Sequence, residues 1–279
     1  MASKILVMKA PQQDTDCVIP VKKNKFRILL VDGFNMIRRI YEARPDPDIE
    51  AVIRASVQSL QRALNEHRPT HAVVVLEYHD KTWRHLLYGD YKAGRSPTPK
   101  PLLQGIKQFE DAFQKAGVNS FSLASYEADD IIATFAQGTG KTHEAIILSS
   151  DKLYLQLLSD HISVVSHFDS HRFTKEDVQN RYGVAPSQLV DYWSLVGDSS
   201  GNIKGVPGIG AKTASRLLES WHSLDNMLKS EVDDRHLNNI RDHEVVARRC
   251  RQLVTLKTDV ELGTNLRDYR LMVSWDDPL

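Results

Sequence analysis

The chain has 279 residues, of which 41% are hydrophobic and 26% are charged. This length can bury one large core, or a core with a small appended domain, and the composition excludes a disordered chain. The 36 basic and 36 acidic residues give a formal net charge of zero. A nucleic-acid-binding surface would therefore have to come from local clusters of basic side chains.

Cysteine content and hydropathy together predict a cytoplasmic protein. Cys17 and Cys250 are far apart and form no CxxC unit, so we expect two reduced thiols and no zinc site. No apolar run approaches the roughly 18 residues that a membrane-spanning helix needs. The first residues are interrupted by Lys4 and Lys9, unlike a signal peptide. We expect no membrane association and interpret residues 1–25 as an irregular N-terminal extension.

Short apolar runs alternate with amphipathic periodicity in the next part of the chain. The alternation predicts an α/β fold with a central, mainly parallel sheet flanked by helices. Strands are expected at residues 27–32, 71–77, 118–123 and 144–151, and helices at residues 49–66 and 102–116. Three of these strands end in acids, namely Asp32, Glu77 and Asp151. Because the carboxyl ends of parallel strands meet at one edge, these acids should cluster there and require a cation.

The sharpest acidic motif is Glu127-Ala128-Asp129-Asp130, which precedes the apolar run IIATFA. It predicts the start of a helix. Taken alone, acids in a first turn more often stabilise the helix dipole, by about 0.3–1 kcal/mol each, than bind a metal. Together with the strand-end acids they favour a site for Mg²⁺ or Mn²⁺, because these ions prefer oxygen ligands. A pair of such ions suits phosphodiester hydrolysis.

A basic and aromatic stretch covers residues 81–100 (KTWRHLLYGDYKAGRSPTPK). Its basic side chains can contact phosphates, and Trp83, Tyr88 and Tyr91 can stack on unpaired bases. A solvated amphipathic helix followed by a Pro-rich loop explains the stretch equally well. Its position just after Glu77 favours substrate handling.

A glycine-rich segment, residues 203–213 (IKGVPGIGAKT), lies between helices expected at residues 187–196 and 211–220. It is not a P-loop, because Ala211 separates Gly210 from Lys212. The pattern GVPGIG between two helices predicts a helix–hairpin–helix, in which the glycines let the backbone approach a DNA strand closely. A tight structural turn is the weaker alternative. The chain after this segment is expected to be mostly helical.

Taken together, the motifs resemble the bacterial 5′-nuclease family, which includes the 5′-nuclease domain of DNA polymerase I and the flap endonucleases. The matching stretches are LLVDGFNMIRR, RHLLYGDYKAGR, YEADDIIAT, SSDKLYLQLL and GDSSGNIKGVPGIGAKTA. The resemblance implies an α/β nuclease core over residues 26–184, with a helical gateway around residues 80–110 that a single-stranded flap passes through. It also implies a helical DNA-binding region over residues 185–279 that contains the helix–hairpin–helix.

The resemblance also assigns site residues. One or two Mg²⁺ (or Mn²⁺) ions per chain would be held by Asp32, Glu77, Glu127, Asp129, Asp130, Asp151 and Asp198. Catalytic side chains would be Asp32, Glu127, Asp129, Asp130, Arg84 and Lys92. One K⁺ ion would be held at the hairpin by the backbone carbonyls of Leu195, Val196, Lys204, Val206 and Ile209. DNA would be contacted by Arg95, Gly208, Ile209, Gly210, Ala211, Lys212 and Thr213.

Three positions depart from the family pattern. The usual SGDKD appears as SSDKL, so Leu153 stands where an Asp is common, and the usual GDSSDN appears as GDSSGN, so Gly201 replaces another Asp. Glu77 stands where the family has the shorter Asp. The first group of acids is largely kept, whereas the second is reduced to Asp198. We therefore expect one firmly bound metal and a second that is weak or arrives with the substrate phosphate.

The predicted function is a metal-dependent, structure-specific DNA 5′-nuclease. It would act as a monomer on 5′-flap, branched or nicked duplex DNA in replication or repair. The alternative is a DNA-structure-binding protein with weak or no nuclease activity, because acids are missing at Leu153 and Gly201. An RNA nuclease is a third alternative, since two ions suit any phosphodiester, but a hairpin that grips duplex favours DNA.

Overall fold

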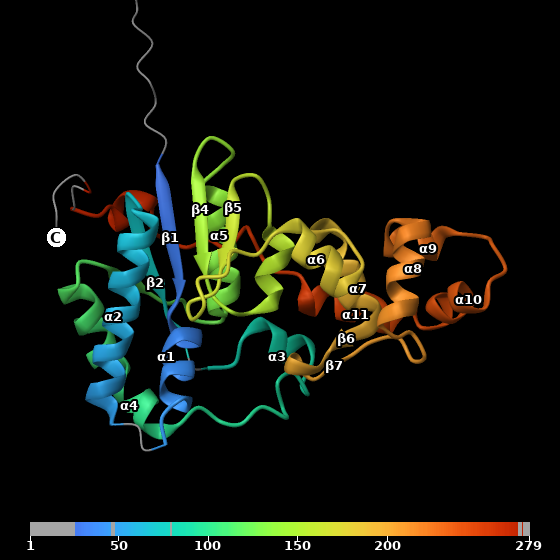
Figure 1. Cartoon of the computed structure of the whole chain (residues 1–279). Helices are drawn as coiled ribbons and strands as arrows, with labels where there is room; N and C mark the ends of the chain where they lie inside the picture. Colours follow the sequence, from blue (N-terminus) through green and yellow to red (C-terminus); the bar gives the residue numbers. More distant parts are fainter. Residues whose placement is uncertain (1–25, 46–47, 79, 273–274, 276–279) are drawn as a thin grey trace, which may run out of the picture.

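The computed structural model describes residues 26–45, 48–78, 80–272 and 275, so the expected extension over residues 1–25, including Cys17, lies outside the described residues. Five parallel strands form the central sheet in the order β3-β2-β1-β4-β5 (Figure 1). The strands are β1 Arg27–Asp32, β2 His71–Val75, β3 Asn119–Phe121, β4 Glu144–Leu148 and β5 Ile162–Val165. The predicted parallel sheet is confirmed.

The two faces of the sheet are covered by different helices, because successive strand residues point to opposite sides. In β1, Leu29 and Val31 pack with α1 (Gly33–Glu42), α2 (Ile49–His67) and α4 (Lys100–Lys115). Ile28 and Leu30 face the opposite way and pack with α5 (Ala128–Gly138). All four side chains are fully buried. A strand covered on both faces is apolar at every position, which is why this stretch reads as a continuous run.

The acids expected at the strand ends lie at or just beyond them. Asp32 is the last residue of β1 and is paired in register with Val75 of β2. Glu77 and Asp151 follow β2 and β4 by two and three residues, respectively, and so lie in the connecting loops. Since β2, β1 and β4 are neighbours, the loops after them open on the same edge of the sheet.

The expected gateway contains less helix than predicted. Helix α3 covers only Trp83–Leu87, and the chain from residue 88 to residue 99 forms turns and irregular backbone before α4. Thr82 and His85 make a capping box at the start of α3, which fixes this short helix although it is only five residues long.

The rest of the chain is mainly helical up to Val254. Its elements are η1 Lys152–Leu157, α6 Lys175–Tyr182, η2 Pro186–Gln188, α7 Leu189–Val196, β6 Gly197–Asp198, η3 Ser199–Gly201, β7 Ile203–Lys204, α8 Ala211–Trp221, α9 Leu224–Lys229, α10 Arg235–Asp242, α11 Glu244–Val254 and η4 Leu266–Tyr269. The expectation of a mostly helical tail is wrong beyond α11, where residues 255–265 form no helix.

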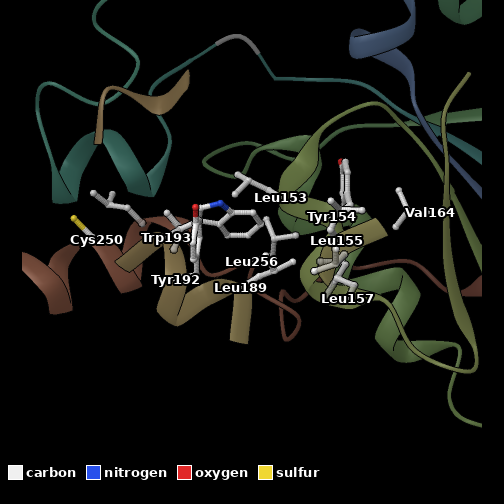
Figure 2. Packing of buried hydrophobic residues seen from close by; sticks show 14 of the residues in the cluster. Leu153, Tyr154, Leu155, Leu157, Val164, Leu189, Tyr192, Trp193, Cys250 and Leu256 are labelled. Atoms are coloured by element: carbon white, nitrogen blue, oxygen red, sulfur yellow. The ribbon is translucent and has the colours of Figure 1, made fainter. Parts of the chain in front are cut away.

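One apolar cluster joins the sheet to the helices that follow it. It runs from Cys250 of α11 through Trp193 of α7 to Leu153 of η1 and Val164 of β5 (Figure 2). All of these side chains are more than nine-tenths buried. The cluster therefore fixes η1, which follows Asp151, between the sheet and α7.

After α11 the chain returns to the sheet. The Lys257 N–H donates a hydrogen bond to Asp130 at the start of α5 (2.9 Å). Further along, the Leu271 N–H donates to the carbonyl of Thr70 just before β2 (3.0 Å), and Arg270 forms an antiparallel bridge with His71. Residues 255–271, the tail, thus run from the start of α5 to the first residue of β2.

Candidate active site

Carboxylates from several segments line one open cleft of about 650 Å³. The Asp32 side chain caps α1 by accepting a hydrogen bond from the N–H of Asn35 (3.1 Å). Asp151 caps η1 in the same way through the N–H of Leu153 (2.8 Å). The other expected ligands that line the cleft come from the loop after β2, the start of α5 and β6, and they are Glu77, Glu127, Asp129 and Asp198. Glu42 of α1 and Asp80 line it as well. The structure thus brings together all of the expected carboxylate ligands except Asp130.

Asp32 and Asp129 share one buried hydroxyl as a donor. The Tyr154 hydroxyl donates to Asp129 Oδ1 (2.9 Å) and lies 3.4 Å from Asp32 Oδ2. Burial, with the nearby charge of Asp151, raises the pKa of Asp32 to about 7 despite a hydrogen bond from Ser149. Burial and then the charges of Asp151 and Asp32 raise the pKa of Asp129 well above its ordinary value. A cation here would relieve both the burial and the repulsion.

Lys92 places its ammonium group among the acids on the gateway side of the cleft. Its Nζ lies 2.7 Å from Glu127 Oε1 and 3.9 Å from Glu77 Oε1. Burial alone would lower the pKa of Lys92, but the Glu127 charge outweighs it and the pKa lies above its ordinary value. Burial would likewise raise the pKa of Glu127, yet Lys92 and Arg84 hold it below the ordinary value. Both partners are therefore charged at neutral pH.

Asp130 and Arg84 do not line the cleft. Both side chains are completely buried, and Arg84 donates to the two carboxylate oxygens of Asp130 at 2.7 and 2.8 Å. Arg84 also donates to the backbone carbonyls of Leu253 (2.8 Å) and Thr255 (3.2 Å). The structure does not place either side chain in the cleft, and the metal and catalytic roles expected of them stay predictions. Their ion pair holds α3, α5 and the tail together instead of facing metal or substrate.

The aromatic residues of the gateway are mostly used inside the protein. Trp83 donates its indole N–H to Asp130 Oδ2 (2.8 Å), and the Lys257 ammonium lies 4.6 Å from its ring centre. Tyr91 is 4% exposed and donates its hydroxyl hydrogen to Glu127 Oε2 (3.0 Å). Tyr91 is therefore too buried to stack on an unpaired base in this structure, whereas stacking on Trp83, which is half-buried, stays a prediction.

Asp198, the remaining member of the second group of acids, is fully hydrogen-bonded within the chain. Its Oδ1 lies 2.5 Å from Lys152 Nζ, and its Oδ2 accepts hydrogen bonds from the Ser200 hydroxyl (2.6 Å) and the Gly201 N–H (2.9 Å). Burial alone would raise the pKa of Asp198, but the hydrogen bonds from Lys152 and Ser200 outweigh it and the pKa is lowered. Asp198 is therefore an ionised carboxylate that already has a cation beside it.

The glycine-rich hairpin packs against the end of α7. A Cβ atom on Gly205 would lie 2.3 Å from the carbonyl oxygen of Leu195, so only glycine fits there. Gly208 has a φ of +78°, which favours glycine as well. Gly210 and Lys212 are exposed at the start of α8, where no side chain caps the first turn. Its backbone N–H groups are therefore available to an anion.

The carbonyls expected to hold K⁺ lie on the two backbone segments that meet at Gly205. The carbonyl of Leu195 accepts a hydrogen bond from the Val206 N–H (2.8 Å), and that of Lys204 accepts one from the Cys250 thiol (2.8 Å). Each carbonyl oxygen has a second lone pair. The donor set of neutral oxygens therefore still fits a monovalent cation.

Comparison with known proteins identifies the family. Residues 27–183 match the model of the 5′-3′ exonuclease N-terminal resolvase-like domain, and residues 184–277 match that of the 5′-3′ exonuclease C-terminal SAM fold. The chain belongs to the 5′-3′ exonuclease family. Flap endonuclease Xni of Vibrio vulnificus (strain YJ016) is 38% identical over 248 residues, which cover 87% of this chain and 96% of that protein. Flap endonuclease Xni of Yersinia enterocolitica (serotype O:8, biotype 1B) is 39% identical over 252 residues, which cover 88% and 99%.

A solved structure supports the fold of this exonuclease-family chain. The flap endonuclease of bacteriophage T5, in a pseudo-enzyme–product complex with DNA and metal ions, has a TM-score of 0.68 and 21% sequence identity. The match covers 82% of this chain and 88% of that chain.

Two cleft residues escaped the sequence analysis. Arg38 and Arg39 of α1 line the cleft, and Arg38 donates to the carbonyl of Ser96 in the gateway (3.4 Å). Together with Lys92 and Arg95 they give the cleft basic side chains from two segments of the chain. They could have been found from the sequence, because they lie two turns after Asp32 on a helix that begins at the site.

The described helices include none that is both long and apolar enough to cross a bilayer.

Proposed function

We propose that this chain is a metal-dependent, structure-specific DNA 5′-nuclease with flap endonuclease activity. The observation that carries the proposal is that acids from the ends of neighbouring parallel strands line the same cleft as basic side chains of the gateway and of α1. Acids suit a metal-assisted phosphodiester hydrolase, and the basic residues suit a polyanionic substrate. The relatives named flap endonuclease point to the same chemistry.

The acids of the cleft fit Mg²⁺ or Mn²⁺. Within the part of the chain that the structure describes, no three of them are close enough to enclose an ion by themselves. Mg²⁺ keeps several waters, so few direct ligands are needed. We assign Asp32, Asp129 and Asp151 to this ion, because the mutual repulsion that raises the pKa of Asp129 calls for a cation, and Glu77 and Glu127 to its water ligands. The ion would supply a hydroxide nucleophile and stabilise the leaving oxygen.

Basic residues of the gateway would hold the substrate. Lys92 can move its ammonium group from Glu127 to a phosphate, because both contacts are charge-assisted and of similar strength. Arg95 is exposed on the same wall of the cleft and suits bidentate contact with phosphate. Arg38 and Arg39, which line the same cleft, would guide the same strand.

The hairpin would hold the duplex at a distance from the cleft. Gly210, Ala211 and Lys212 are exposed at an uncapped helix start, where backbone N–H groups suit one phosphate of the DNA backbone, whereas the Ile209 N–H already donates to the carbonyl of Val206 (3.1 Å). A K⁺ ion on the carbonyls around Gly205 would add positive charge at this point. The division at residues 184 and 185, the monomeric state and the cytoplasmic location remain part of the proposal.

A DNA-structure-binding protein with little catalysis is the second candidate. The observation in its favour is Asp198, whose carboxylate oxygens are already occupied by Lys152, Ser200 and Gly201. It predicts tight binding of branched DNA with no metal-dependent cleavage.

The deciding experiment compares wild type and Asp129→Ala on 5′-flap, nicked and single-stranded DNA with Mg²⁺, with Mn²⁺ and with a chelator. We expect the wild type to cut the flap substrate fastest and only with metal, and the variant to bind but not cut. Cleavage by Asp129→Ala at the wild-type rate would show that the site is misassigned. Flap binding without cleavage by the wild type would favour the second candidate.

A further inference from the structure

Tyr154 connects the apolar cluster to the acids of the cleft. It belongs to that cluster and has no exposed surface, yet its hydroxyl donates a hydrogen bond to Asp129 Oδ1 (2.9 Å) and lies 3.4 Å from Asp32 Oδ2. Figure 2 shows the hydroxyl at the end of the ring that points away from Leu155 and Leu157. Tyr154 is not among the residues that line the cleft, so it reaches both acids from the interior of the protein.

The three acids that we assign to the metal ion are held in different ways. Asp32 and Asp151 each accept a hydrogen bond from a backbone N–H of the helix that they cap. Among the described residues, only Tyr154 donates a hydrogen bond to the side chain of Asp129. The charges of Asp151 and Asp32 act on Asp129 as well. The orientation of the Asp129 carboxylate therefore depends on the Tyr154 hydroxyl.

The short helix η1 gives this hydroxyl a fixed position. Asp151 caps η1, and Tyr154 follows it by three residues, a spacing at which side chains of a 3-10 helix lie above one another. Leu153 and Leu155, the sequence neighbours of Tyr154, are buried in the apolar cluster. The same element therefore carries one ligand of the ion and the hydrogen-bond donor to a second ligand.

We propose that Tyr154 is a positioning residue for the metal ion, because its hydroxyl orients the Asp129 carboxylate next to Asp32 before the ion binds. The inference rests on the proposed metal-dependent function. A phenol hydroxyl is a neutral donor at physiological pH, so it can hold one oxygen of Asp129 without adding charge and leaves the other oxygen for the ion. Removing a hydrogen-bond partner of a metal ligand typically weakens metal binding about 10–100-fold.

The test measures the affinity of the full chain for Mn²⁺ from the electron paramagnetic resonance signal of free Mn²⁺, without DNA. Tyr154→Phe keeps the ring and removes only the hydroxyl. Tyr269→Phe is the matched control, because Tyr269 is also buried and its hydroxyl bonds to Thr264 (3.3 Å), and it does not line the cleft. Circular dichroism and thermal unfolding in a chelator verify that each variant is folded. Cleavage of a 5′-flap substrate is then followed as a function of Mn²⁺ concentration.

We expect Tyr154→Phe to raise the Kd for Mn²⁺ by about 10–100-fold, and Tyr269→Phe to leave it unchanged. The Mn²⁺ concentration that gives half-maximal cleavage should rise by the same factor in Tyr154→Phe. At saturating Mn²⁺ its kcat should return to the wild-type value, because the hydroxyl touches neither the substrate nor the ion. A general structural defect would lower kcat at every Mn²⁺ concentration.

The remaining outcomes separate this inference from the nuclease proposal. An unchanged Kd for Mn²⁺ in folded Tyr154→Phe, or a kcat that stays low at saturating Mn²⁺, would overturn the role of Tyr154 and leave the nuclease proposal standing. Weaker Mn²⁺ binding by Tyr154→Phe, in a protein whose wild type binds Mn²⁺ but does not cut, would support the inference and overturn the nuclease. A wild type that binds no Mn²⁺ would overturn both.

A second measurement on the wild type decides if Tyr154→Phe does not fold. Binding of an ion to Asp129 changes the acceptor of the Tyr154 hydroxyl, so adding Mn²⁺ should produce a tyrosine signal in the near-ultraviolet difference spectrum. Absence of that signal at saturating Mn²⁺ would overturn the inference.

Discussion

Arg84 and Asp130 form an ion pair with two hydrogen bonds (2.7 and 2.8 Å) in which both side chains have zero exposure. Burying a guanidinium group is tolerated only when its donors are satisfied. Here the remaining donors reach Glu127 and the carbonyls of Leu253 and Thr255. The ion pair fixes the position of Asp130. It therefore also helps to position Glu127 and Asp129, which lie three residues and one residue before Asp130 and face the cleft.

Removing the charge of Arg84 should therefore lower the stability of the fold, and any loss of cleavage should follow from that. We expect Arg84→Met to lower the free energy of unfolding by about 3–5 kcal/mol, because Asp130 is left as an unpaired buried charge. Urea denaturation measures the loss. In the double variant Arg84→Met with Asp130→Leu, much of it should be recovered. A folded Arg84→Met that keeps full stability but loses cleavage would instead show direct contact with the substrate.

The raised pKa of Asp32 makes the metal-free protein less stable as pH rises. Its pKa is about 7 against an ordinary value of 3.8, so between these values the folded chain binds a proton that the unfolded chain has lost. The contribution of Asp32 to the free energy of unfolding is fully present below pH 3.8 and is lost as the pH rises to about 7.

Asp32→Asn should remove this loss. In the presence of a chelator at about pH 8 we expect it to raise the free energy of unfolding by about 1–3 kcal/mol, and to have little effect at about pH 4. Thermal unfolding across this pH range measures it, with the exposed Asp259→Asn as control. Equal effects of Asp32→Asn at both pH values would contradict the pKa assignment.

Lys92 should matter for the reaction. It is the cation nearest to Glu127 and Glu77 within the cleft. We expect Lys92→Met to lower kcat on a 5′-flap substrate by about 10²–10³-fold, the usual effect of removing one group that stabilises transition-state charge. Lys107→Met, which removes an exposed lysine from α4, should leave kcat unchanged. A similar drop in both variants would point to general loss of positive charge.

Substituting the hairpin glycines should have two different effects, depending on whether a Cβ atom fits at the position. A Cβ atom on Gly205 would be 2.3 Å from the Leu195 carbonyl oxygen, whereas one on Gly210 would meet nothing within 4 Å. We therefore expect Gly205→Ala to lower the melting temperature and to weaken duplex binding at least tenfold, and Gly210→Ala to leave the melting temperature unchanged. Fluorescence anisotropy with duplex DNA and thermal unfolding provide the two readouts. Full duplex binding by Gly205→Ala would remove the hairpin from the proposed interface.

Potassium should act at the hairpin and not at the cleft. We expect duplex affinity to be higher in KCl than in LiCl at equal ionic strength, because Li⁺ holds its hydration shell more tightly than K⁺ and exchanges it less readily for neutral backbone carbonyls. The same comparison on Gly205→Ala should show no difference. Equal affinities of the wild type in the two salts would exclude K⁺ from the interface.

The sequence predicted most of the sheet and most of the acidic cluster. Runs such as RILLVD mark strands that are buried on both faces, and a terminal acid such as Asp32 is placed at the sheet edge by topology alone. The predicted helix over residues 49–66 is observed as Ile49–His67, because Asp48 caps its first turn and Arg68 ends it with a φ of 42°.

What the sequence could not show is which neighbour each acid would meet. Asp129 and Asp130 are adjacent on α5, and only the approach of Arg84 and of Lys257, which lies 127 residues away, turns Asp130 from the cleft. The contact between Lys152 and Asp198 depends in the same way on the packing of two distant segments. Local periodicity determines the faces of a helix, but it does not determine the tertiary partner of each face.

The path of the tail determines when the contacts of Arg84 and Asp130 can form during synthesis of the chain. The carbonyl of Thr255 and the N–H of Lys257 complete the polar contacts of Arg84 and Asp130, and the N–H of Leu271 joins the backbone before β2. These residues leave the ribosome after every other element of the cleft. During synthesis the acidic end of α5 therefore lacks these contacts until residues 255–271 have emerged, so the cleft is completed well after its own strands and α5 have been made.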